Sequence, residues 1–403
     1  MKKSLFVCIG IMLVAWSFPF PVTAVDVENV VKNYVSMDQA RTNAHGVLLN
    51  FVPMGPLSDS EAWKEATINE TPITIYDPNG LKLYYLFAVE QDGTPIGEIE
   101  VSASKVLRSP VPSVNLKPHT WDFDQAQEIA KKIAAEKYPH HTITSIKPVD
   151  YAPSRIGAMA ELSGPENNSY ERIVVDAHTF TIIPEDLPPE AEGRHGAVCV
   201  ESLYDTIPDR VVDEYVAQWN EQHEGIQSMI AENNDVRSSC ADITNDGAAY
   251  KELSGFSLFG QEKTYYCMPA TGQMIADYFG VTHTQDHIAG EMGTTPTGSF
   301  PEGMVAYFSG IVPDGLGRTG SEVDWSPTFS EVWQEIYHYD RPVASSVDRG
   351  STAHTRACVG YLITSTPRAN RQYIFDPLPV DEGSKVWEDT ATVEYLDNVY
   401  VGS

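Results

Sequence analysis

Residues 261–279 read QEKTYYCMPATGQMIADYF, and this stretch decides the fold class of the C-terminal part of the chain. After Cys267, apolar side chains recur at a spacing of four residues, at Ala270, Met274 and Tyr278. This spacing predicts a helix with a broad apolar face that packs on a core. Cys267 therefore lies at the N-terminus of the predicted helix.

The position of Cys267 favours a reactive sulfur. A helix N-terminus carries a partial positive charge and free N–H groups, and both stabilise a thiolate relative to a thiol. Pro269 suits the first turn, because its missing N–H would have no partner there anyway. Gln261, six residues upstream, offers a side-chain amide that could bind an oxyanion together with the backbone N–H of Cys267. The competing interpretation is an ordinary cysteine buried in an apolar core.

Two later segments supply a base and a group that orients it. Residues 353–363 read AHTRACVGYLI, a buried-strand pattern with His354 at its start, and residues 372–379 read QYIFDPLP, a strand that ends at Asp376 before a proline. The connection between them is short enough for a hairpin, so antiparallel pairing would bring His354 beside Asp376. His354 could then take the proton of Cys267 while Asp376 accepts the other ring N–H. Taken singly, the histidine and the aspartate are more simply a strand-edge residue and a turn residue.

The order and setting of these residues resemble a known family. The resemblance is carried by Gln261, Cys267-Met268-Pro269-Ala270-Thr271, His354 with Gly360-Tyr361, and Asp376-Pro377. From about residue 253 to 401 the chain resembles papain-fold cysteine peptidases of the bacteriocin-processing-peptidase-like family. Members commonly have glycine where Met268 stands, so the larger side chain is expected to narrow the site. The resemblance implies a papain-like domain over residues 250–403 that needs no metal or organic cofactor.

The N-terminal half shows a helix followed by a three-stranded meander, twice over. The first unit spans residues 26–115 and the second spans residues 116–190, and hairpin signals such as Asp77-Pro78-Asn79-Gly80 separate the strands. This α+β layout resembles the PepSY-type modules of peptidase propeptides, and the order of the two halves resembles that of secreted zymogens. We therefore expect the N-terminal region to act as an intramolecular inhibitor or chaperone. Residues 191–249 are expected to form a linker and an amphipathic helix.

Residues 1–24 have the pattern of a secretory signal peptide. Lys2 and Lys3 precede an apolar run that is short for a membrane span of about 20 residues, and Val22-Thr23-Ala24 is a small-residue cleavage pattern. A retained membrane anchor is the alternative. We expect a secreted or extracytoplasmic protein without stable membrane insertion after cleavage, in which Cys199 and Cys240 could form a disulfide.

Charge and composition limit the partners. The formal net charge of −29 repels the phosphate backbone of nucleic acids, which disfavours a nucleic-acid role.

His283 and His287 are four residues apart, but no third metal ligand is evident in the sequence, so a surface helix is the simpler interpretation. Cys358 shares a strand face with His354 and is expected to be a core cysteine.

Three functions remain open on this evidence. The first is a thiol protease that hydrolyses a peptide or protein substrate through a thioester, made as a zymogen. The second keeps the fold but transfers the acyl group to an amine, as an acyltransferase or transglutaminase does. The third is a non-catalytic module that binds peptides.

Overall fold

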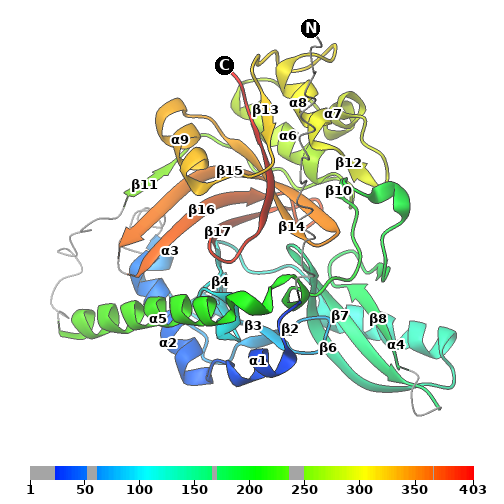
Figure 1. The fold of residues 1–403 in the computed structure, drawn as a ribbon, viewed down its shortest axis with the longest axis vertical. Helices are drawn as coiled ribbons and strands as arrows, with labels where there is room; N and C mark the ends of the chain where they lie inside the picture. Colours follow the sequence, from blue (N-terminus) through cyan, green and yellow to red (C-terminus); the bar gives the residue numbers. More distant parts are fainter. Residues whose placement is uncertain (1–22, 52–60, 166–169, 236–248, 366) are drawn as a thin grey trace, which may run out of the picture.

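The structure is a computed structural model that describes residues 23–51, 61–165, 170–235, 249–365 and 367–403. Nearly all of the predicted signal peptide, and Cys240 of the predicted disulfide, lie outside these residues. The described part is a mixed α+β structure in which helices flank a large, mostly antiparallel sheet (Figure 1). No helix in the described part is long and apolar enough to cross a membrane.

The described residues of the N-terminal half contain four α-helices and two meanders of three antiparallel strands, β2 to β4 and β6 to β8. Its elements are α1 (Val27–Lys32), α2 (Met37–Phe51), α3 (Glu61–Lys64), β1 (Thr67–Ile68), β2 (Ile73–Tyr76), β3 (Lys82–Gln91), β4 (Thr94–Ser102), β5 (Ser113–Asn115), α4 (Phe123–Lys137), β6 (Thr142–Ala152), β7 (Arg155–Ser163), β8 (Tyr170–Asp176) and β9 (Ile182–Ile183). Helix α4 begins at the N-cap Asp122, whose side chain accepts a hydrogen bond from the Gln125 amide. Its buried face is made of alanines, which lets the helix lie close to β7 and β8.

The C-terminal half surrounds a long central strand, β15 (Thr352–Ser365). Its other elements are α5 (Val212–Asp235), β10 (His195–Gly196), β11 (Ala249–Glu252), α6 (Cys267–Tyr278), α7 (Gln285–Met292), β12 (Gly298–Ser299), α8 (Pro301–Ser309), β13 (Glu322–Asp324), α9 (Phe329–Tyr339), β14 (Val343–Arg349), β16 (Arg368–Asp376), β17 (Ser384–Asp389) and β18 (Tyr395–Tyr400). Helix α6 buries Met274 and Ile275 completely, in an apolar cluster that also contains Val359 of β15. This burial fixes α6 on the sheet.

The two halves share one hydrogen-bonded sheet. Strand β5 pairs with β4 of the N-terminal half on one side and with β17 of the C-terminal half on the other. Its central residue, Val114, lies opposite Ile99 and Trp387, and all three are completely buried. From one end to the other, the strands follow the order β9, β8, β7, β6, β2, β3, β4, β5, β17, β16, β15, β14, β18 and β13. Neighbours in this order are antiparallel except β2 and β6.

The segment that we expected to be a linker contributes a strand. His195 and Gly196 form β10, which pairs with β12 and with the first residues of β15. No pattern in the sequence predicted this strand, because two residues are too few to show a period. The amphipathic helix expected after it is present as α5.

Candidate active site

Cys267 is the first residue of α6, as its sequence setting predicted. The residue before it, Tyr266, is the N-cap and makes no side-chain capping hydrogen bond to the helix. The first N–H groups of α6 are therefore not covered by a capping side chain, and the partial positive charge of the helix end acts at the sulfur. Thr271, one turn further on, donates a hydrogen bond of 3.0 Å to the Thr355 carbonyl of β15, which fixes the first turn of α6 against the strand that carries His354.

His354 and Asp376 are brought together by β15 and β16. The two strands are antiparallel neighbours, with Ala357 opposite Phe375, as the short connection predicted. His354 Nε2 lies 2.7 Å from Asp376 Oδ1, and the backbone N–H of Leu378 donates to the same oxygen at 2.8 Å. Because the ring uses Nε2 for the carboxylate, Nδ1 is left for Cys267.

The electrostatics of this pair follow from its neighbours. Burial disfavours a charged imidazole, but the charge and hydrogen bond of Asp376, followed by a hydrogen bond with Cys267, raise the pKa of His354 above its ordinary value. Burial likewise disfavours the carboxylate, but the charge and hydrogen bond of His354 keep the pKa of Asp376 below its ordinary value. The arrangement therefore favours an imidazolium next to an ionised Asp376. Such an imidazolium is the partner that a thiolate needs.

Gln261 is joined by its backbone to the residue after Asp376, but its side-chain amide already donates a hydrogen bond to another residue. Its backbone N–H donates to the Pro377 carbonyl at 2.8 Å, which ties its loop to the end of β16. Its side-chain Nε2 donates to the Lys263 carbonyl at 2.7 Å. Oε1 is buried and has no hydrogen-bond partner among the described residues. An oxyanion role for this amide stays a prediction, and it requires the bond to Lys263 to be shared or exchanged.

One supporting residue was not found by sequence reasoning. Gln285, the first residue of α7, donates to the Gly260 carbonyl at 2.8 Å and accepts from the Glu262 amide at 2.8 Å. These bonds hold the backbone on both sides of Gln261. In the sequence, Gln285 appears only as a polar residue at a helix start, so nothing local distinguishes it.

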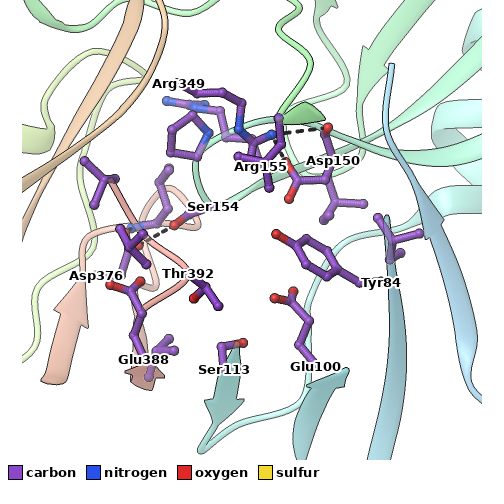
Figure 2. Close-up of a pocket in the computed structure, with 18 of the residues that line it drawn as sticks. Tyr84, Glu100, Ser113, Asp150, Ser154, Arg155, Arg349, Asp376, Glu388 and Thr392 are labelled. Atoms are coloured by element: carbon purple, nitrogen blue, oxygen red, sulfur yellow. Dashed lines mark hydrogen bonds and ion pairs between the residues drawn. The ribbon is translucent and has the colours of Figure 1, made fainter. Parts of the chain in front are cut away.

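The N-terminal half reaches this group through the turn between β6 and β7. Ser154, which has a positive φ of 59°, donates to Asp376 Oδ2 at 2.7 Å (Figure 2). Arg155 donates to the carbonyl of Thr264, three residues before Cys267, at 2.9 Å. Both contacts connect positions more than one hundred residues apart, which no local pattern reveals.

The predicted site residues are closed off from solvent in this arrangement. Their exposed fractions are 0% for Cys267 and Gln261, 1% for Asp376 and 4% for His354. A cavity of about 700 Å³ lies between the two halves of the molecule. Asp376 lines this cavity, whereas Cys267 and His354 are not among its lining residues. Figure 2 shows Glu100, Tyr84 and Glu388 pointing into it. Burial, followed by the charge of Asp150, raises the pKa of Glu100 to about 8.

The other cysteines lie in different surroundings. Cys358 is completely buried in an apolar cluster, and burial raises its pKa to about 12, so it is the core cysteine that we predicted. Cys199 is buried, with its sulfur 3.8 Å from Ser351 Oγ. Since Cys240 lies outside the described residues, the Cys199–Cys240 disulfide stays a prediction.

Within the described residues, one group has the composition of a metal site. Ligand atoms of His287, Glu291 and Asp314 all lie within 4.8 Å of one another. The group includes His287 but not His283, whose Nδ1 lies 2.9 Å from the Tyr307 hydroxyl. His287 and Glu291 are on α7, and Asp314 is in the segment after α8.

Two comparisons with known proteins found matches for the region of the chain that contains this site. Residues 253–401 match the Peptidase_C39 like family. This C39-like region contains Cys267, His354 and Asp376, so the match supports a cysteine peptidase in general terms. A solved structure, the peptidase domain of Streptococcus ComA, a bi-functional ABC transporter involved in a quorum sensing pathway, is 16% identical. That match covers 37% of this chain and 99% of the ComA domain, with a TM-score of 0.25. The comparison with curated proteins found no significant match.

Proposed function

We propose that the chain is a cysteine peptidase in which Cys267 is the nucleophile, His354 the general base and Asp376 the residue that orients His354. The observation that carries the proposal is the single ring of His354, whose Nε2 lies 2.7 Å from Asp376 Oδ1 and whose pKa is raised by Asp376 and also by Cys267. A histidine held between a carboxylate and a helix-terminal thiol has the arrangement of an activated nucleophile.

The proposed reaction proceeds in two stages. In the resting pair His354 already holds the proton of the Cys267 thiol, and the thiolate attacks the peptide carbonyl to give a tetrahedral oxyanion. The free N–H groups at the start of α6 would bind this oxyanion, joined by the Gln261 amide once its hydrogen bond to the Lys263 carbonyl is shared or exchanged. His354 then gives its proton to the leaving amine, which leaves a thioester on Cys267. Water attacks the thioester with His354 as base and releases the acid.

The Cys267→Ala variant tests the proposal. We expect hydrolysis of an unstructured peptide pool by the activated enzyme to fall by about 10⁴-fold or more, because no other group replaces the nucleophile. The melting temperature should change little, since the lost sulfur leaves only a small void. Cys358→Ala is the matched control and should retain hydrolysis. If Cys267→Ala still hydrolyses peptides at the wild-type rate, the nucleophile is misassigned.

We further propose that the chain is exported and that its N-terminal region inhibits the site. The first proposal rests on the pattern of residues 1–24, and a mature N-terminus at Val25, found by mass spectrometry, is the expected result. The second is supported by the contacts of Ser154 and Arg155 and by the burial of Cys267 in the full-length chain.

The Ser154→Ala variant separates inhibition from assistance. If the turn inhibits, losing this hydrogen bond should raise the rate of Cys267 alkylation about fivefold, the equivalent of roughly 1 kcal/mol for one bond. If Ser154 instead helps to orient Asp376, the rate should fall. Ser163→Ala, at the exposed far end of β7, is the control and should leave the rate unchanged. An unchanged rate in Ser154→Ala would remove the inhibitory role of the turn.

A further inference from the structure

Strand β10 lies between the two parts of the molecule that carry Cys267 and His354. His195 pairs with Ser299 and Gly196 with Gly298 of β12, in antiparallel register. On its other side, His195 pairs in parallel with Ala353, the residue immediately before His354. Figure 1 shows β10 and β12 together at the beginning of β15. The strand thus fills a slot between the helical layer and the sheet.

The slot is narrow at Gly196. This glycine has a φ of 110°, and a Cβ there would lie 2.6 Å from the carbonyl oxygen of Tyr265, two residues before Cys267. The contact with β12 is closer still, because a Cβ on Gly298 would lie 2.1 Å from the His195 carbonyl oxygen. Backbone therefore meets backbone on both sides, and only glycine fits at these two positions.

The side chains of the two residues before Gly196 contact both neighbouring strands and the start of α8. The His195 ring is 1% exposed, with Nδ1 2.9 Å from Thr355 Oγ1 and Nε2 3.2 Å from Oδ2 of the completely buried Asp397. Arg194 donates to the Gly298 carbonyl at 3.1 Å, and its guanidinium lies over the Phe300 ring. Main-chain pairing on both edges, with the His195 side chain buried against Thr355 and Asp397, is how an extended peptide is recognised when it adds to a sheet.

We propose that the slot between β12 and the start of β15 is the peptide-binding site of the molecule, and that residues 194–196 fill it as an internal ligand. This inference rests on the proposed peptidase function and adds its mode of substrate binding and regulation. The preferred ligand is an extended peptide that contains a histidine or another basic residue followed by glycine. The basic side chain contacts Asp397, as His195 does. No other peptide can bind until β10 leaves.

The Gly196→Ala variant of the full-length protein tests this inference. The added methyl group collides with the Tyr265 carbonyl, so β10 should leave the slot and expose Cys267. We expect iodoacetamide to alkylate Cys267 at least about tenfold faster than in the wild type, as measured by site-resolved mass spectrometry. The control is Gly290→Ala on α7, where an added Cβ meets no atom within 4 Å, and it should leave the rate unchanged.

A synthetic peptide then tests the slot directly. A peptide with the sequence of residues 190–198 should protect Cys267 of the Gly196→Ala variant from alkylation, and the same peptide with alanine at the Gly196 position should not. If Gly196→Ala does not fold, His195→Ala, which removes the contacts to Thr355 and Asp397, replaces it in both assays. A folded variant with the wild-type alkylation rate and no peptide protection would overturn the inference.

These assays do not depend on turnover. Faster alkylation with peptide protection, but without hydrolysis of any peptide, would keep the binding slot and reject the peptidase proposal.

Discussion

Helices α4 and α6 are of similar length and both bury one face on the sheet, but their N-termini differ. Helix α4 is closed by Asp122, whose carboxylate accepts from the Gln125 amide. Helix α6 begins at Cys267 after a tyrosine that provides no side-chain cap. A cap stabilises a helix by about 1 kcal/mol, so leaving it out has a cost. The difference shows that α6 gives up local stability where its end faces a thiol and an imidazole.

Among the variants that test the α6 end, Asp376→Asn should give the largest fall in the hydrolysis rate. The amide cannot stabilise an imidazolium, so the hydrolysis rate should fall by roughly 10²- to 10⁴-fold. Because the carboxylate raises the pKa of His354, the alkaline limb of Cys267 alkylation should also move to lower pH. The Asp381→Asn variant, five residues on, is the control. An unmoved limb would show that Asp376 does not set the charge of His354.

The same pair predicts how stability depends on pH. The lowered pKa of Asp376 contributes stability above the unfolded-state pKa of aspartate, and this is lost as the pH falls through the folded-state value. The raised pKa of His354 contributes stability below the unfolded-state pKa of histidine, and this is lost as the pH rises through the folded-state value. Urea unfolding of wild type and Asp376→Asn across this range should therefore differ most between the two unfolded-state values.

Thr271→Val sharpens the comparison by loosening α6 without touching the sulfur. Valine keeps the shape but leaves the buried Thr355 carbonyl without the hydroxyl donor, which costs about 1–3 kcal/mol of unfolding free energy. Alkylation of Cys267 should slow as well, because the first turn of α6 is no longer held against β15. Thr271→Ser, which retains the hydroxyl, should behave like wild type in both measurements. Equal unfolding free energies for the two variants would contradict this role of the bond.

Asp122→Ala should give the smallest effect, and one confined to stability. Loss of the α4 cap should lower the unfolding free energy by about 1 kcal/mol. The alkylation rate of Cys267 should stay at the wild-type value, because α4 lies in the N-terminal half against β7 and β8. Asp124→Ala, in the first turn but not the capping residue, is the control. A changed alkylation rate in Asp122→Ala would mean that the two helix ends are coupled.

Local patterns in the sequence predicted much of the candidate site. The four-residue spacing after Cys267 placed the sulfur at a helix start, and the run from His354 to Asp376 predicted the β15–β16 hairpin that joins them. Both features depend on contacts close in sequence. They could be derived without knowing how the halves pack.

The missing parts depend on contacts between distant segments. Ser154 and Asp376 are 222 residues apart, and β10 is only two residues long. The hydrogen bonds of Gln285 to the Gly260 and Glu262 backbone have no signature either, because glutamine at a helix start is unremarkable. Hydrophobic periodicity cannot register such features, so the turn, the filled slot and the support of Gln261 could be found only in three dimensions.

Strand β5 has a consequence for maturation. Its three residues belong to the N-terminal half in sequence, yet they hydrogen-bond to β17 through the buried Val114 and Trp387. A protease that cuts the chain between β9 and α6 would therefore produce a nicked molecule whose two polypeptides stay associated. The fragments should co-elute under native conditions and separate only in denaturant. Opening the site by local displacement of a turn or a short strand requires far less of the sheet to break than shedding the whole N-terminal half.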